Sequence, residues 1–154
     1  MSGDHPLSTT WKRVRAEATE LAAERRAAGA ETVEAAADHG AARVADGRLS
    51  LLFTVPDDDA ADLARFGADR ATTDTRVHYV DTDGYRCYVL EVDADGGDAV
   101  AVIVGAVAHD RLAAAADADP DGATTVVRRV DDSRVLRLHH ESEAPFLAAL
   151  PDAE

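Results

Sequence analysis

The chain has 154 residues, and 30 acidic side chains against 16 basic ones give it a net charge of -14 at pH 7. So many like charges destabilise a compact state unless salt screens them, and at 1 M salt the screening length falls to about 3 Å. The composition therefore predicts adaptation to concentrated salt, and it argues against binding to nucleic acids or anionic membranes. Twenty-one of the acids are aspartate, fifteen of the bases are arginine, and Lys12 is the only lysine.

Length and cysteine content limit the architecture. The chain fits one domain, which we expect to span residues 1–154, with residues 1–8 as a disordered tail. Cys87 is the only cysteine, so no intramolecular disulfide can form. The first residues form no apolar secretory segment, and the longest apolar run, 99–108, is too short to cross a bilayer. We therefore expect a cytoplasmic protein.

The first predicted element is a long helix. The hydroxyl residues at 8–10 suit a helix N-terminus, and apolar residues from Trp11 to Leu21 recur at helical spacing. Gly29 is expected to end this helix in the left-handed conformation.

The rest of the chain alternates between apolar strands and short helices. Residues 31–37 fit either a short strand or more helix, whereas residues 39–47 resemble a loop. Pro56 ends an apolar strand, and the acids that begin at Asp57 suit the positive N-terminal end of a helix. The expected strands are 49–55, 75–80, 85–92, 99–107, 124–130 and 134–140. The expected later helices are 57–67, 110–117 and 143–150.

The turns between strands indicate the fold class. Residues 81–84 and 93–97 are rich in Asp and Gly, which tolerate positive φ. Strands joined by such short turns pair antiparallel. We therefore expect the α+β class, with a single mainly antiparallel sheet of about five to seven strands and helices packed on it. Strand 99–107 is apolar on both faces and should be central.

Three segments, in their order, resemble a known family. They are Ala28-Gly29-Ala30-Glu31-Thr32, then Leu51-Leu52-Phe53-Thr54-Val55-Pro56, and then Val104-Gly105-Ala106-Val107 followed by Asp110-Arg111-Leu112. Together they resemble a family of small haloarchaeal proteins known only as a domain of unknown function. The resemblance implies an archaeal cytoplasmic setting and brings no catalytic residues with it.

Several aspartate motifs suggest metal chemistry, but each lacks a residue that the chemistry needs. The segment 117–122 matches the opening of an EF-hand loop, yet Arg128 stands at the twelfth position, where Ca²⁺ requires a carboxylate. The acids after Pro56 resemble a phosphohydrolase motif, yet the required lysine is missing. No glycine-rich phosphate loop is present, so we expect no cofactor. These aspartates fit turns and helix ends better than metal sites.

His139, His140 and Cys87 each have a structural and a functional interpretation. Adjacent strand residues point to opposite faces, so the two histidines could share a zinc ion only if the strand ended there. His109 could join them only if its strand end lay nearby. Arg86 could lower the pKa of Cys87, but a cysteine within a strand is usually a small buried hydrophobe.

Two basic clusters are the most unusual feature of so acidic a chain. One lies on the last predicted hairpin, where alternation places Arg134 on the face of Leu136 and Arg137 on the opposite face. The other lies in the first turns of the first helix, where positive charge opposes the helix dipole unless carboxylates or a bound anion compensate it. Pairing with surplus aspartates is the simplest explanation of both. The candidate contacts for a partner or an anion are Arg128, Arg129, Arg134, Arg137, His140, Lys12, Arg13 and Arg15.

We therefore predict a small cytoplasmic domain, adapted to salt, with a non-catalytic binding or regulatory role. Its partner would be another protein or a second copy of the chain, with no membrane contact. The alternative hypothesis is a metal-assisted hydrolase that uses aspartates and a histidine at strand ends. The residues considered for that alternative are Asp57, Asp59, Asp93 and His140.

Overall fold

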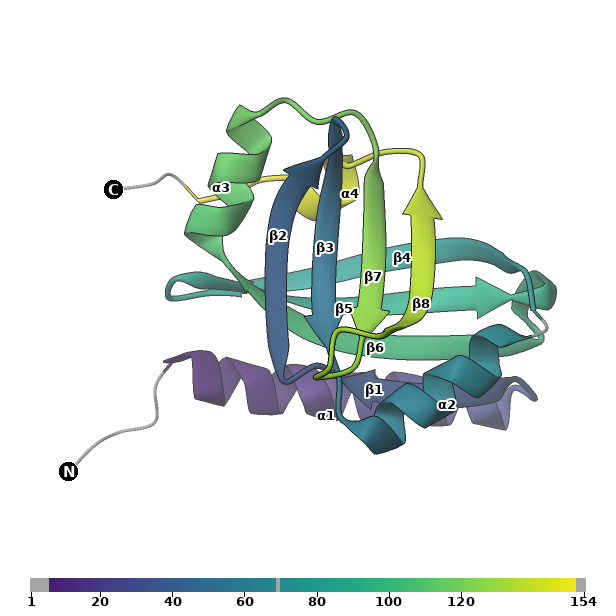
Figure 1. Cartoon of the computed structure of the whole chain (residues 1–154). Helices are drawn as coiled ribbons and strands as arrows, with labels where there is room; N and C mark the ends of the chain where they lie inside the picture. Colours follow the sequence, from purple (N-terminus) through teal and green to yellow (C-terminus); the bar gives the residue numbers. More distant parts are fainter. Residues whose placement is uncertain (1–5, 69, 152–154) are drawn as a thin grey trace.

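The computed structural model describes residues 6–68 and 70–151, which form two four-stranded sheets packed face to face and flanked by helices. In sheet A the strand order is β1-β6-β5-β4, and in sheet B it is β2-β3-β7-β8. The strands of the two sheets cross each other (Figure 1). The strands are β1 (Glu31–Ala36), β2 (His39–Ala45), β3 (Arg48–Thr54), β4 (Thr72–Thr82), β5 (Tyr85–Ala94), β6 (Ala99–Ala108), β7 (Ala123–Arg128) and β8 (Arg134–His140).

The α+β class was predicted correctly, but the single mainly antiparallel sheet was wrong. The hairpins β4–β5, β5–β6 and β7–β8 are antiparallel, as the short turns indicated. Two further pairings, β1 with β6 and β3 with β7, are parallel and join segments far apart in the chain. Turn composition carries no information about such pairings, because parallel strands need long crossover connections. As a result the strands form two sheets, each with both parallel and antiparallel pairings.

The loop expected at residues 39–47 was also wrong, because this segment forms β2 and the turn into β3. Asp46 and Gly47 have φ angles of 54° and 76°, the geometry of a two-residue hairpin turn. The chain passes from sheet A to sheet B just before β2, where the N–H of Ala37 donates to Val104 of β6 and that of Asp38 donates to Thr54 of β3, both at 2.8 Å. The Asp-Gly pair was the overlooked signal.

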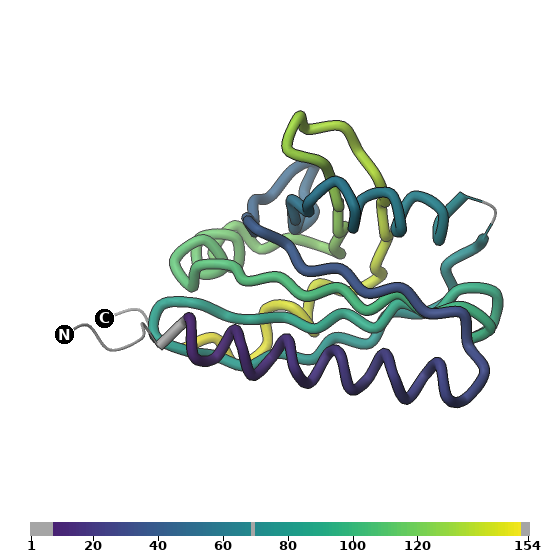
Figure 2. The backbone as a smooth tube through the Cα atoms, turned by 90° about the horizontal axis from the view of Figure 1, so that it is seen from below, coloured from purple at the N-terminus to yellow at the C-terminus, as the bar shows by residue number. Residues whose placement is uncertain are grey.

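The helices cover sheet A and the margins of the sandwich. Figure 2 shows the longest helix running along one side of sheet A, with sheet B on the other side. Its residues Val14, Ala18 and Ala22 are buried against the outer face of sheet A. In Figure 1, no helix of the described chain crosses the outer face of sheet B. The helices are α1 (Pro6–Ala27), α2 (Asp57–Ala68), η1 (Asp95–Gly97), α3 (His109–Asp117) and α4 (Ala144–Leu147).

Helix α1 begins within the segment 1–8 that was expected to be a disordered tail. Residues 6–8 belong to the helix, while residues 1–5 lie outside the described chain. Proline suits the first helical position because its fixed φ is helical and its missing N–H would have no partner there. Gly29 has a φ of 97°, so the predicted left-handed end of this helix is confirmed.

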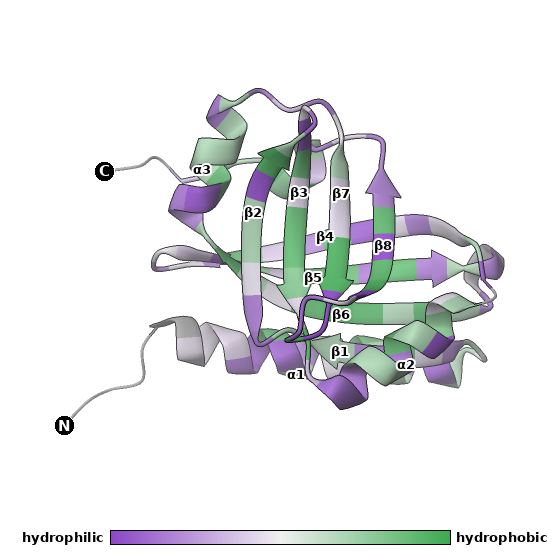
Figure 3. Ribbon diagram, in the orientation of Figure 1, coloured by the Kyte–Doolittle hydropathy of each residue, from purple (hydrophilic) through white to green (hydrophobic). Residues whose placement is uncertain are grey.

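The main core lies between the two sheets. β6 is an inner strand of sheet A, and its apolar residues are buried on both faces, as its sequence predicted (Figure 3). A Cβ atom added to Gly105 would lie 2.3 Å from Phe53 of β3, and one added to Gly40 would lie 2.2 Å from the carbonyl oxygen of Ala106. These glycines therefore allow the two sheets to approach each other closely.

A buried arginine fastens the C-terminal segment to this core. The Arg86 side chain is fully buried and donates to both carboxylate oxygens of Asp81 at 2.8 and 2.9 Å. The same guanidinium donates to the carbonyl oxygens of Phe146 at 3.2 Å, Ala148 at 2.7 Å and Ala149 at 3.2 Å. These hydrogen bonds satisfy the buried guanidinium and join β5 to the C-terminal segment, so the cluster stabilises the packing of α4.

Candidate functional site

Five arginines from all four strands meet on the uncovered outer face of sheet B. They line a shallow depression of about 300 Å³, and we call this surface the arginine face. It combines arginines of the predicted C-terminal hairpin with arginines of β2 and β3 that were not among the contact residues predicted from the sequence. The five are Arg43, Arg48, Arg128, Arg134 and Arg137.

The strand register places these arginines around an uncharged centre. Ser50 and Leu52 of β3 lie beside Thr124 and Val126 of β7. These four residues face outward, because the residues that alternate with them on both strands are buried between the sheets. On the neighbouring edge strands, Arg43 pairs with Ser50, and Arg137 pairs with Val126. Arg48, Arg128 and Arg134 lie at the two ends of this centre.

The position of Arg134 differs from the prediction. Alternation placed it on the face of Leu136, but it lines the outer depression together with Arg137. The register of the hairpin shifts, because Val127 pairs with Leu136 whereas Arg128 pairs with Arg134. The extra residue, Val135, packs against the core. Such a β-bulge reverses the alternation of side chains, and here it adds a guanidinium to the outer face.

The arginines of this face differ in how they are held. Arg48 donates to the carbonyl oxygens of Ala123 at 2.6 Å and His140 at 2.8 Å, so its charge is fixed in place without a carboxylate. Arg128 lies 3.6 Å from Asp132. Among the described residues, no carboxylate lies within ion-pair distance of three others, Arg43, Arg134 and Arg137. Asp46 and Asp132 are the acids that line the depression.

Two predicted contact residues of the hairpin lie elsewhere. Arg129 is directed toward the start of α2, where its guanidinium lies 4.0 Å from Asp57. The Nε2 atom of His140 lies 2.9 Å from the Thr125 hydroxyl oxygen, and the centroids of the His140 and Phe146 rings are 4.9 Å apart. Burial lowers the pKa of His140 to about 4, with His139 and Arg48 adding to the shift. The imidazole is therefore neutral at pH 7 and adds no charge to a partner surface.

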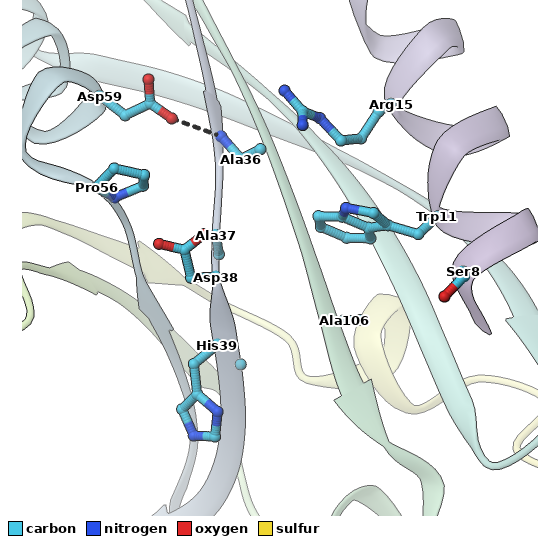
Figure 4. Close-up of a pocket in the computed structure, with 11 residues that line it drawn as sticks. Ser8, Trp11, Arg15, Ala36, Ala37, Asp38, His39, Pro56, Asp59 and Ala106 are labelled. Carbon is cyan, nitrogen blue, oxygen red and sulfur yellow. Dashed lines mark hydrogen bonds between the residues drawn. The ribbon is translucent and has the colours of Figure 1, made fainter. Parts of the chain in front are cut away.

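The basic residues of α1 also separate. Arg15 lines a cavity of about 390 Å³ together with Trp11, one helical turn away, whereas Lys12 and Arg13 do not line it. Figure 4 shows both lining side chains on one side of the segment between β1 and β2, with Asp59 on the other side. The Asp59 carboxylate accepts a hydrogen bond from the backbone N–H of Ala36 at 3.0 Å.

This cavity carries charges of both signs. Its lining includes the guanidinium of Arg15, the imidazole of His39 and the carboxylates of Asp38 and Asp59. Nothing in the sequence pattern indicated that these residues would meet, because they come from α1, the passage between the sheets and α2. The mixture favours no single ligand charge.

The residues of the hydrolase hypothesis do not meet. Asp59, Asp93 and His140 line three different cavities, and Asp57 lies beside Arg129. In the described part of the chain, no three residues of the types His, Cys, Asp and Glu are placed to hold a metal ion.

The three histidines considered for zinc do not converge on one point, although His139 and His140 line the same cavity. His109 lies 2.9 Å from Asp81 through its Nε2 atom, at the start of α3. His139 and His140 point to opposite faces of β8, as strand alternation predicted: His139 approaches Arg48 on the outer face, and His140 contacts Phe146 inside.

Two other sequence features have structural roles. Cys87 is buried beneath α1, and burial raises the pKa of its thiol to about 11, so it behaves as the small hydrophobe that was predicted. The EF-hand-like segment 117–122 is the turn from α3 into β7. In it, Asp119 has a φ of 52°, and the N–H of Asp121 donates to the carbonyl of Gly47 at 2.8 Å.

These features define a two-sheet α+β domain in which α1 covers sheet A and an arginine-lined face of sheet B is left open. Residues 3–148 match the family of unknown function DUF7529, and the chain belongs to that family. The comparisons found no match among curated proteins or solved structures. Within residues 6–68 and 70–151, none of the helices is long and apolar enough to cross a membrane.

Proposed function

We propose that this chain is a non-catalytic binding domain that holds an anionic protein partner on the arginine face, in the cytoplasm of a salt-adapted cell. The observation that supports this proposal is the gathering of five arginines on a sheet face without helix cover, in a chain whose net charge is -14.

The arginine face contrasts with three arginines elsewhere in the chain that are paired with carboxylates. Arg25 and Arg76 pair with the buried Glu91 at 2.6 and 3.0 Å, and Arg86 pairs with Asp81. Side by side, the guanidiniums of the arginine face repel one another, although the chain has ample aspartate to neutralise them. Local arrangements that oppose stability are typical of functional sites.

Guanidinium chemistry suits a carboxylate-bearing partner. Its planar fork of N–H donors forms paired hydrogen bonds with carboxylates, and arginine is enriched at protein interfaces. In concentrated salt an exposed charge contact is largely screened, so a stable interface must also bury uncharged area. The uncharged centre of the arginine face provides such area.

The charge distribution supports the salt-adapted setting. Among the described acidic residues, Glu91 is the one that is buried, so the carboxylates serve mainly to hydrate the surface. The hydrolase hypothesis is not retained as a proposal, because its aspartates and histidine lie in separate places.

A paired substitution tests the proposal. Replacing Arg134 and Arg137 with Ala should reduce capture of the partner from an extract of the source organism by about tenfold, which corresponds to a combined loss of about 1.4 kcal/mol from the two arginines. The matched control replaces Arg26 and Arg111 with Ala. It removes the same amount of charge at positions away from the arginine face. Thermal unfolding checks that both variants remain folded. Equal capture by the two variants would contradict the proposal.

A further inference from the structure

We propose that the partner is an extended acidic segment that places one apolar side chain on Leu52 and Val126 while acids on either side bind the surrounding arginines. This inference rests on the proposed function and specifies the chemistry of the partner. It follows from the shape of the arginine face, from its register and from its charge.

The centre of the arginine face fits a single side chain. Leu52 retains 8% exposure and Val126 is half-buried, and the hydroxyl residues Ser50 and Thr124 lie beside them. The depression measures about 300 Å³. An apolar cavity of about 150 Å³ accommodates a group the size of benzene, so this space suits one large apolar side chain and some water.

The register sets the spacing of the acids. Neighbouring strands lie about 4.8 Å apart, so the four strands of sheet B extend over about 14 Å. Arg43 lies on the edge strand β2 and Arg137 on the opposite edge strand β8. In an extended segment, residues two positions apart lie about 7 Å from each other on the same side. Acids two positions before and after the apolar residue would therefore reach these two edges.

The charge pattern favours a protein segment over a nucleic acid. Duplex DNA carries one negative charge per about 1.7 Å. It would extend beyond the five arginines onto the surrounding acidic surface, which would repel its phosphates. Single-stranded nucleic acids need aromatic platforms for stacking, and none of the described residues that line the depression is aromatic. The imidazole of His139 approaches the depression only through its contact with Arg48. A short segment with two or three carboxylates matches the size and charge of the arginine face.

NMR titration of the full chain with three probes tests the inference. The probes are the peptide SGEGLGEGS, its counterpart SGEGSGEGS without the apolar residue, and a short single-stranded oligo-dT. In about 2 M KCl, where charge contacts are screened, we expect the leucine peptide to bind about tenfold more tightly than the serine peptide. The largest shifts should fall on β3 and β7.

Two sets of variants separate the possible results. Val126→Thr keeps the β-branched shape and should remove the preference for the leucine peptide. Arg43→Gln with Arg137→Gln should weaken both peptides by about tenfold when the titration is repeated in about 0.3 M KCl, where charge contacts are screened less. The spectrum of each variant shows whether it is folded.

The possible failures are distinguishable. If the arginine variants bind both peptides as well as the original chain does, the proposed function is overturned. If they weaken both peptides but the leucine and serine peptides bind equally, only the apolar anchor is overturned. If oligo-dT binds more tightly than either peptide, a protein partner is overturned in favour of a nucleic acid.

Discussion

At the scale of single residues, the environment of each arginine decides its role. Arg86 is fully buried and satisfied by Asp81 and three carbonyl oxygens, so it fastens the C-terminal segment. Arg43 and Arg137 lie on the outer face of sheet B without a carboxylate partner among the described residues, so their donors are available. The sequence shows the same residue type at all three positions, and only burial and neighbours separate them.

Removing the buried guanidinium should have a large effect on stability. Arg86→Met would remove the donor shared by Asp81 and the carbonyls of Phe146, Ala148 and Ala149. Because the Asp81 side chain keeps 28% exposure, water can hydrate the carboxylate that remains, and we expect a loss of about 1–3 kcal/mol. Chemical denaturation with urea, in salt, measures this loss in the free energy of unfolding. Arg111→Met, at an exposed position, is the control and should change stability by less than about 0.5 kcal/mol. A loss below about 1 kcal/mol in Arg86→Met would contradict the role given to this cluster.

At the scale of elements, close contact between the sheets depends on small residues. β6 approaches β3 at Gly105, where there is no space for a Cβ atom beside the Phe53 ring. Val and Ile would raise strand propensity at this position, but packing between sheets overrides that preference.

A double substitution tests this contact. Gly105→Ala should destabilise the fold by about 1–3 kcal/mol because the new methyl group forces Phe53 out of its position. Phe53→Leu, which frees part of that space, should restore some stability when combined with it. The interaction free energy from the four unfolding measurements gives the coupling directly. Strictly additive losses would show that the ring and the glycine do not compete for the same space.

At the scale of the whole molecule, the net charge of -14 opposes folding in dilute solution. The acids lie almost entirely at the surface of the described chain, where salt can screen them. Ion pairs offset only part of the repulsion, because acids outnumber bases by nearly two to one.

Stability should therefore rise with salt. We expect the midpoint of thermal unfolding to increase by about 10 °C or more between about 0.1 M and 2 M KCl, since a few kcal/mol shift the midpoint by this amount in a domain of this size. Circular dichroism measures the transition. Sorbitol stabilises without screening charge, so the same series in sorbitol separates the two effects. An unchanged midpoint across the KCl series would mean that the surplus carboxylates do not limit stability.

Local features of this protein could be predicted from its sequence: the first helix and its glycine end, the hairpins β4–β5, β5–β6 and β7–β8, the buried strand β6 and the membership of a family of unknown function. These depend on periodicity and turn chemistry between residues close in the chain. Long-range packing divides the strands into two sheets, because the parallel pairings β1–β6 and β3–β7 join distant segments. It also decided that Arg43 and Arg48 join the arginines of the last hairpin, since a missed strand and a β-bulge set which side chains share the outer face.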